Sequence, residues 1–439
     1  MRKKRYLSFI VLAVITGILT VASPKIALML IGILLLLVLP LDILAWITAF
    51  TSSWSAIALW NVGTVGIQIS YATGFMLLGK LILQKRLQGR TYLTAGVPAG
   101  LLLILSVVAI YIDRGSFKLT LFGWAHLVIM FGIFVALTSY LARDPEKLSW
   151  LAKGFLSGVT VQCLAAGYQE MAFYLGLPFS HTLLNNKSFN VAGFALYNGN
   201  PRANGFSPEA SMLGEVILSA LPLAVLLPSN LLGAQKYWRW VMAGIFILTG
   251  FLTLTRGTLF IMIPEIVFLA LMVKKFRAYA IGITLTMATL FTGLSTLLIH
   301  RITHFSIGAD LSTKIRFSEY LIGWHMFLGH FLFGVGINQF IPQSLHYVKY
   351  AFVYRPYYNA DNLLIGQLAE TGLIGTVIMG WWIYSEGFLR KIDLNNPFIL
   401  GTIFVFLDMI GSTYTWAFTY VIFMLAMSRT YVRYSVPVA

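Results

Sequence analysis

The chain has 439 residues, of which 58% are hydrophobic and only 10% are charged. A soluble core of this size could not bury so much apolar surface, so the lipid bilayer is the expected solvent for most of it. The net charge of +16 does not indicate a nucleic-acid partner, because Lys and Arg fall mainly in short breaks between apolar runs, where positive residues orient membrane spans. The single cysteine, Cys163, excludes a disulfide framework.

Apolar runs of ~17 to 25 residues, each long enough to cross a bilayer as a helix, follow one another along the chain. They lie at 6–22, 26–40, 42–60, 64–84, 91–112, 119–142, 149–177, 210–228, 239–255, 257–273, 279–299, 362–386, 396–411 and 413–428. The run at 42–60 is the weakest, because Asp42 and "TSSWS" interrupt it, and the last two runs could form a single hairpin. We therefore expect an all-α, polytopic transmembrane helix bundle of about 12–14 spans.

The basic breaks between these runs predict the topology. With the run at 42–60 counted as a span, all of them face the cytoplasm, and both chain termini lie there too. We interpret the first apolar run as an uncleaved helix and not as a signal peptide. Five regions are expected: N-terminal helices at 1–177, an extracytoplasmic loop at 178–209, central helices at 210–299, a large extracytoplasmic loop with short surface helices at 300–361, and C-terminal helices with a cytoplasmic tail at 362–439.

Three arginines lie at the expected outer boundary of the membrane. Arg202 precedes a span in "NPRANGFSPEAS", Arg256 lies between two spans in "LTLTRGTLF", and Arg316 lies in the large loop in "TKIRFSEYLIGW". The planar guanidinium stays charged and binds pairs of phosphate oxygens, so these residues suit an enzyme that acts on a lipid-linked diphosphate. The alternative is that each arginine snorkels or pairs within its own loop.

The stretch "YYNADNLLIGQLAETGLIG" carries polar residues into an apolar run. Asp361 lies where the large loop meets the next helix. It could be the N-cap of that helix, and a carboxylate there could also accept the proton of an attacking sugar hydroxyl. Asn362, with Arg355 and Tyr358 of the loop, is expected to bind substrate, since aromatic faces stack on sugar rings. The alternative for the tyrosine is anchoring at the membrane interface.

Two polar residues lie further along the same run. Glu370 cannot act with Asp361 as a catalytic pair, because nine residues of helix separate them by ~13 Å, whereas paired glycosidase carboxylates need ~5 to 9.5 Å. Glu370 forms an i, i+4, i+8 stripe with Asn362 and Gly366, which should face the bundle interior. Glu370 and Gln367 are therefore expected to hold helices together.

The sequence predicts neither a metal site nor a cofactor. The histidines in or beside the large loop have no carboxylates at a recognised ligand spacing, and no HExxH motif is present. They are His300, His304, His325, His330 and His346.

Four motifs follow one another between about 195 and 385. "RANGFSPEASMLGEVILSALPLA" looks like an Arg-x-x-Gly-Phe segment that leads into a span, "TRGTLF" looks like a Ser-Arg-Gly motif, and "RFSEYLIGWHMFLGHFLFGVGINQF" looks like a loop with Arg, Trp and Gly-x-Gly. "DNLLIGQLAETGLIG" is similar to a signature of His-Asn, nine residues, Gly, two residues, Gly. In this order they resemble the bacterial O-antigen polymerases and O-antigen ligases, integral membrane glycosyltransferases acting on undecaprenyl-diphosphate-linked glycans.

The resemblance implies roles for three residues. Asp361 stands where ligases carry the histidine that activates the acceptor, and Arg256 and Arg316 stand where the donor diphosphate is held. An aspartate at that position is similar to what many polymerases have. The resemblance thus implies a polysaccharide polymerase of the bacterial plasma membrane, with an extracytoplasmic active site and a metal-independent, inverting transfer. The implied partners are an undecaprenyl-diphosphate-linked oligosaccharide, the lipid bilayer, and a chain-length regulator and a flippase of the same pathway.

Two other functions stay open at this point. An O-antigen ligase would move the glycan to lipid A core. A lipid-linked oligosaccharide flippase or other transporter would use the arginines to line a path, but transporters commonly have repeated halves with interrupted helices at matching positions. This chain concentrates its polar groups in one outer loop and its flanks. The product of a polymerase could be O-antigen, capsule or exopolysaccharide.

Overall fold

The computed structural model describes residues 38–55, 58–62, 65–87, 89–113, 115–177, 196–197, 200–228, 231, 236–290, 311–353, 360–385, 393–412 and 419–435. The expected span at 6–22 lies outside the described residues, as do most of the span at 26–40, the end of the span at 279–299 and the start of the span at 413–428.

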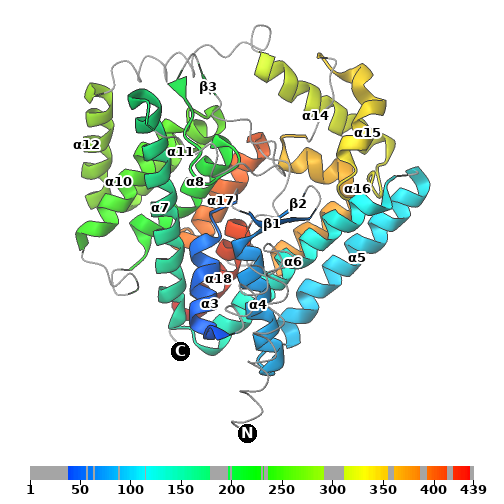
Figure 1. Cartoon of the computed structure of the whole chain (residues 1–439), viewed down its shortest axis with the longest axis horizontal. Helices are drawn as coiled ribbons and strands as arrows, with labels where there is room; N and C mark the ends of the chain where they lie inside the picture. The colour runs from blue at the N-terminus through cyan, green and yellow to red at the C-terminus, as the bar shows by residue number, and fades with distance from the viewer. Residues whose placement is uncertain are drawn as a thin grey trace, which may run out of the picture.

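The described part of the chain is a helical bundle, which confirms the predicted fold class (Figure 1). Its helices are α3 (Leu41–Thr51), α4 (Ile69–Leu83), α5 (Gly89–Asp113), α6 (Phe117–Arg143), α7 (Lys147–Leu175), α8 (Ala210–Leu226), α10 (Lys236–Leu252), α11 (Arg256–Met272), α12 (Lys274–Leu290), α14 (Leu311–Gly329), α15 (Phe340–Tyr347), α16 (Leu363–Ser385), α17 (Pro397–Ser412) and α18 (Thr419–Ser435), with a 3-10 turn, η2 (Val348–Tyr350). Two short antiparallel hairpins pair β1 (Ala58–Val62) with β2 (Val65–Gln68), and β3 (Leu196–Tyr197) with β4 (Asn200–Pro201).

Three of the described helices are long and apolar enough to cross a membrane, by length and composition. These spans are Ala95–Ile112 of α5, Phe117–Arg143 of α6 and Leu363–Ser385 of α16. On α5, Val97, Leu101, Ile104 and Val108 are exposed at helical spacing. A continuous apolar stripe of this kind is costly in water and is expected where a helix faces lipid.

The expected span at 42–60 is not one helix. Helix α3 ends at Thr51, and the chain turns before β1 begins at Ala58. Ser52 Oγ donates to Ala49 O at 2.7 Å, and Thr51 Oγ1 donates to Ile47 O at 2.7 Å. Short hydroxyl side chains bond the local backbone in this way and compete with helix continuation, so the "TSSWS" interruption ends the helix.

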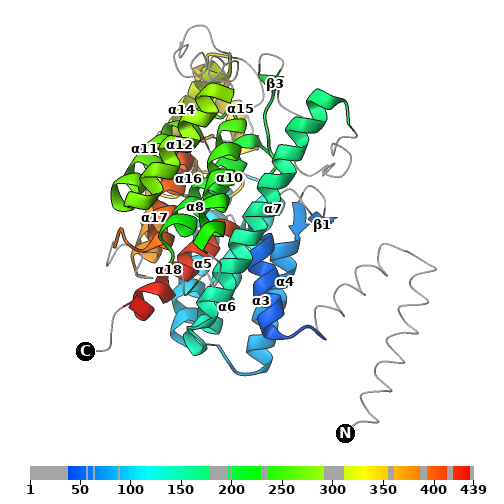
Figure 2. The ribbon, with the colours of Figure 1, turned by 90° about the vertical axis from the view of Figure 1, so that its left-hand side faces the viewer.

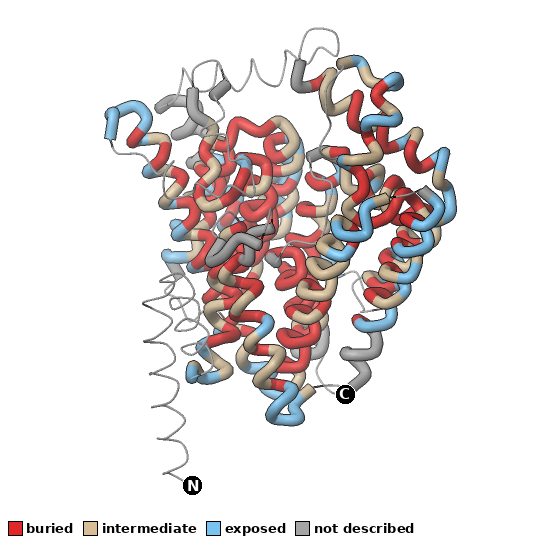
Figure 3. Tube along the Cα trace, turned by 45° about the vertical axis from the view of Figure 1, so that its right-hand side comes forward, coloured by how far each residue is buried: buried red, intermediate tan, exposed pale blue. Residues whose placement is uncertain are grey.

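Helix α8 lies at the centre of the bundle. Nearly all its side chains are buried, and it packs against α7, α10, α11 and α17. Helices α7, α8 and α10 run side by side (Figure 2). Buried residues concentrate in the interior of the bundle, while exposed residues lie at its periphery and in its end loops (Figure 3). A helix that is mostly apolar around its whole circumference, as α8 is apart from Glu215 and two serines, is expected at such a central position.

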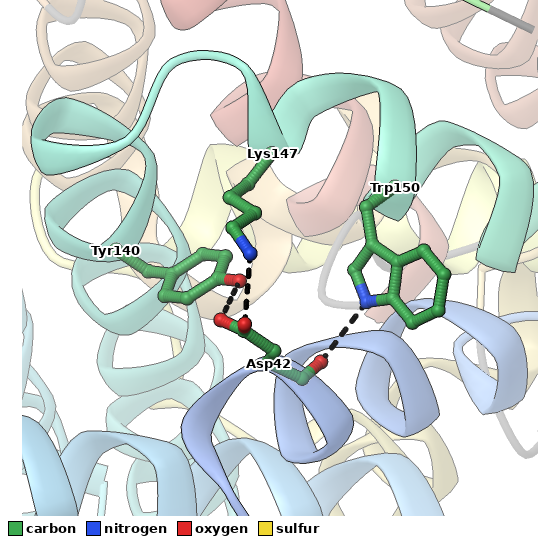
Figure 4. A network of polar contacts seen from close by, with 4 residues as sticks. All are labelled: Asp42, Tyr140, Lys147 and Trp150. Carbon is green, nitrogen blue, oxygen red and sulfur yellow. Dashed lines mark hydrogen bonds and ion pairs between the residues drawn. The ribbon is translucent and has the colours of Figure 1, made fainter.

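Asp42 joins three helices at the end of the bundle where α6 passes into α7 (Figure 4). Its Oδ2 pairs with Lys147 Nζ at 2.8 Å, and its Oδ1 accepts a hydrogen bond from Tyr140 Oη at 2.6 Å. Trp150 Nε1 donates to the Asp42 carbonyl at 3.2 Å. The acid therefore lies at a partly exposed helix end, where an ion pair stabilises the fold by at most about 1 kcal/mol.

Helix α16 is interrupted at Gly372, which has φ 64° and ψ −169°. The backbone groups freed by the break exchange hydrogen bonds with residues 331–336, which we call the docking turn. Four bonds join Val335 N to Ala369 O (2.9 Å), Gly336 N to Glu370 O (2.9 Å), Leu373 N to Phe331 O (2.9 Å) and Ile374 N to Leu332 O (3.2 Å). Because unpaired backbone groups are costly away from water, this exchange stabilises both the break and the turn.

We predict that Gly372→Ala destabilises the protein by about 3 kcal/mol. A Cβ at this position would lie closer than 3.0 Å to backbone atoms of Leu332 and Gly334, in a conformation that L residues rarely adopt. Thermal unfolding of the purified protein in nanodiscs measures the change. Gly380→Ala on the same helix is the matched control, because a Cβ there meets nothing within 4 Å. Equal unfolding temperatures for the two variants would contradict the interlocking of α16 with the docking turn.

Candidate active site

Arg202 is fastened to the turn between α10 and α11. Its Nε donates to Thr253 O at 3.2 Å, and its Nη2 donates to Thr255 Oγ1 at 2.9 Å. Ala203 N also donates to Leu252 O at 3.2 Å. Thr255 is the N-cap residue of α11, and Arg256 is the first residue of that helix. The fold thus brings Arg202 beside Arg256, although 54 positions separate them in the sequence.

The turn between α10 and α11 contains an unusual backbone conformation. Leu254 has φ 48° and is buried. A left-handed conformation is rare for a leucine and costs about 1–3 kcal/mol, so it persists only where the surrounding structure fixes it. The turn presents the N-terminus of α11, whose free amides carry partial positive charge and attract anions. Arg202 and Arg256 add two full positive charges at the same place.

Helix α14 connects Arg256 to Arg316. Arg256 Nη1 donates to Thr313 Oγ1 of α14 at 3.3 Å. Arg316 lies three residues further along the same helix and is partly buried. It interacts electrostatically with Tyr320, one turn further on, and with Asp408 of α17. The three arginines that the sequence singled out are therefore linked by described contacts through Thr255 and Thr313.

Asp361 lies beside the same helix. Tyr320 Oη donates to the Asp361 carbonyl at 3.4 Å, and the Tyr320 phenol also interacts with the Asp361 carboxylate. Burial raises the pKa of Tyr320, the charge of Arg316 opposes that rise, and the charges of Asp361 and Glu319 add to it. Tyr320 is thus a hydrogen-bond donor at neutral pH. Asp361 itself has φ 41°, a second left-handed residue in the site.

The N-cap of α16 is Asn362, so the interpretation of Asp361 as the cap is wrong. Asn362 Oδ1 accepts a hydrogen bond from Ile365 N at 3.0 Å, and Asn362 O accepts one from Gly366 N at 2.8 Å. Asp361 precedes this cap and is in a left-handed conformation, which directs the chain out of the helix. Asn and Asp both suit N-cap positions, and only the backbone path decided which of the two neighbouring residues caps α16.

Glu370 and Gln367 lie in the first half of α16, before the break. Glu370 Oε1 accepts a hydrogen bond from Phe340 N at 3.3 Å, at the start of α15. This contact joins α16 to the large outer segment and supports a structural role for the acid. Gln367 Nε2 donates to Thr371 Oγ1 at 2.8 Å, which in turn donates to Gln367 O at 2.8 Å. The described bonds of Gln367 thus stay within its own helix.

Buried acids close to the arginines are part of the arrangement, and no motif in the sequence assigns them a role. Thr258, two residues after Arg256, donates its Oγ1 to Asp408 Oδ2 at 3.3 Å. Tyr420 Oη donates to Glu215 Oε2, and Glu215 and Asp408 interact electrostatically. All four side chains are at most 1% exposed. An acid inside an apolar run is a signal for a functional or paired group, but nothing local indicates its partner.

Arg355 and Tyr358 lie outside the described residues. His325 stacks on Tyr350 with ring centroids 3.6 Å apart, and His330 Nε2 lies 3.1 Å from Tyr347 Oη. Within the described ranges, no group of three or more His, Cys, Asp or Glu side chains gathers at one place.

The described part of the chain thus combines helices long and apolar enough to cross a membrane with three arginines, two helix N-termini and a carboxylate that described contacts link. Residues 240–380 match the family model described as O-antigen ligase. The matched segment, which contains Arg256, Arg316 and Asp361, therefore belongs to the O-antigen ligase and polymerase family, as the motifs predicted. The match supports a glycan-transfer function in polysaccharide biosynthesis. A search of curated proteins found no match.

We predict that Asn362→Ala lowers the free energy of unfolding by about 1 kcal/mol, because it removes the N-cap bond to Ile365 N. Asn362→Asp keeps an oxygen acceptor at the same place and should retain nearly all of that stability. Thermal unfolding in nanodiscs compares the two variants. If Asn362→Ala were neutral while Asp361→Ala cost a similar amount, the cap would lie at Asp361 instead.

Proposed function

We propose that the protein is a polysaccharide polymerase of the bacterial plasma membrane. It transfers a growing glycan from undecaprenyl diphosphate to the terminal sugar of another lipid-linked repeat unit at the outer face. The observation that carries this proposal is the connected set of contacts from Arg202 through Arg256 and Arg316 to Asp361. It supplies positive charge for a diphosphate and a carboxylate for a hydroxyl within one site.

The arginines would hold the donor diphosphate. Arg202 and Arg256 lie at the N-terminus of α11, and Arg316 lies on α14 three residues after Thr313, to which Arg256 donates. Their guanidinium groups and the free amides of the helix would bind phosphate oxygens in the ground state. As the bond from the sugar to the diphosphate breaks, the leaving group gains negative charge, and these same donors stabilise it. No metal ion is required for this role.

Asp361 would act as the general base. The acceptor hydroxyl oxygen attacks the anomeric carbon of the donor sugar, its proton passes to the Asp361 carboxylate, and the carbon–oxygen bond to the diphosphate breaks with its electron pair staying on the diphosphate. A single displacement inverts the anomeric configuration. The left-handed backbone of Asp361 supports this role, because strained residues persist mainly where the fold fixes them for function.

The aspartate favours the polymerase over the ligase. In the family resemblance, ligases carry histidine at the position of Asp361, while many polymerases carry aspartate. A ligase, which would move the glycan to lipid A core, is the alternative within the same family, and the matched family model carries that description. A flippase is a weaker alternative, since it does not need a carboxylate beside the arginines. A chain-length regulator and a flippase would be the protein's partners in the pathway.

We predict that the reconstituted protein converts purified undecaprenyl-diphosphate-linked repeat units into dimers and longer chains, and that Asp361→Asn lowers the rate by about 10²- to 10⁴-fold. Gel separation of the lipid-linked glycans measures the product. Asp393→Asn, at an exposed acid just before α17, is the control and should keep the wild-type rate. If the Asp361→Asn variant forms full-length chains at normal yield, Asp361 is not the general base.

The choice of acceptor separates the alternatives. A polymerase extends lipid-linked units supplied alone, whereas a ligase forms product only when lipid A core is added. A flippase moves the units across the vesicle membrane without lengthening them. If product forms only when lipid A core is added, the protein is a ligase and the polymerase assignment is wrong.

We predict that Arg256→Lys slows transfer by about ten- to hundredfold, because lysine keeps the charge but loses the planar pair of donors. The Michaelis constant for the lipid-linked donor should rise as the turnover number falls. Arg277→Lys on α12, whose Nε donates to Ala270 O at 3.3 Å, is the matched control and should change neither value. Wild-type kinetics for Arg256→Lys would exclude a bidentate contact with the diphosphate.

A further inference from the structure

Four residues on one face of α14 make the contacts that assemble the site. Thr313, Arg316, Tyr320 and Gly323 follow the spacing i, i+3, i+7, i+10, which places them on a single stripe of the helix. The stripe faces α11 at its start and the beginning of α16 further along. One rigid helix therefore spans the distance between the arginines and Asp361.

Two residues of this stripe make hydrogen bonds to different parts of the site. Thr313 accepts the hydrogen bond from Arg256, and Tyr320 donates to the Asp361 carbonyl. The rise along a helix from Thr313 to Tyr320 is ~10.5 Å. Arg316 lies between them, on the same stripe. The helix thus sets the separation between the two groups that the proposed reaction needs.

Close packing beside Tyr320 fixes the segment that carries Asp361. A Cβ on Gly323 would lie 2.6 Å from Ile365 Cγ2 and 3.7 Å from Ala360 Cβ. Ala360 is 0% exposed, so the residue before Asp361 is held against α14. Asn362 holds the residue after Asp361 in the cap of α16. The Tyr320 hydroxyl bonds the carbonyl of Asp361 itself, between these two anchored neighbours.

We propose that Tyr320 is a positioning residue, whose hydroxyl keeps Asp361 in its left-handed conformation and so holds the carboxylate at a fixed distance from Arg316. This inference rests on the proposed function, in which Asp361 is the base. Tyr320 does not exchange a proton with substrate in this role. It acts on the reaction by holding the base in place.

Tyr320→Phe tests the proposal, because it removes the hydroxyl and keeps the ring. We expect the turnover number for chain extension to fall about fivefold while the Michaelis constant for the lipid-linked donor stays within twofold of wild type. Tyr347→Phe is the matched control. It also removes one tyrosine hydroxyl from the outer segment, the one that lies 3.1 Å from His330 Nε2, and should leave both kinetic values within twofold of wild type.

Hydrogen exchange gives a readout that does not depend on the reaction. In nanodiscs, the amides of residues 360–366 should exchange about fivefold faster in Tyr320→Phe than in wild type, and at the wild-type rate in Tyr347→Phe. Unchanged exchange at 360–366 in Tyr320→Phe would overturn the positioning role, whatever reaction the protein catalyses.

The kinetic outcomes keep the two proposals apart. Suppose that the wild-type protein is active, the Asp361→Asn variant is inactive and the Tyr320→Phe variant is fully active. This result would overturn the positioning role of Tyr320 and leave the proposed function standing. A rise in the Michaelis constant with an unchanged turnover number in Tyr320→Phe would also overturn it, since that pattern indicates a substrate contact. Wild type that forms no longer chains would overturn the proposed function, and the exchange measurement would still decide the role of Tyr320.

Discussion

The exchange of backbone hydrogen bonds at Gly372 is the constraint on which the placement of the outer segment depends. In an apolar environment every amide and carbonyl needs a partner, so a helix can be broken only where another segment supplies one. The docking turn at 331–336 does so for both halves of α16. Glu370 adds a bond to the start of α15. The helices α14 and α15, which join the docking turn at either end, are thereby tied to α16.

That connection explains how distant parts of the chain form one site. Helix α14 contacts Arg256 near its start and Asp361 near its middle, so both α11 and the start of α16 hold it in place. Arg202 joins the same region from a segment before α8. Two residues with left-handed backbone, Leu254 and Asp361, occur at the two sides of the site. Residues in such conformations persist where the surrounding structure fixes them.

The acids of the bundle illustrate how polar groups survive in an apolar interior. Asp42 stays at a partly exposed helix end with Lys147 and Tyr140, where water still screens the pair. Asp408 and Glu215 are buried and have hydroxyl donors from Thr258 and Tyr420. Because Arg316 also interacts with Asp408, the buried layer couples to the arginines above it. Asp408 and Glu215 thus belong to the electrostatic environment of the site.

Composition and hydropathy were enough to predict a helical membrane bundle, because the length and apolar character of each run are local properties that can be read from the sequence. The motif order likewise identified the family and the residues Arg202, Arg256, Arg316 and Asp361 as candidates. Only the tertiary structure decided that Asn362 is the cap, that the run at 42–60 ends at Thr51, and that α16 breaks at Gly372. It also supplied Thr313 and Tyr320 as the links between the candidates. The break at Gly372 and the two links depend on contacts between segments far apart in sequence, which no local pattern of residues encodes.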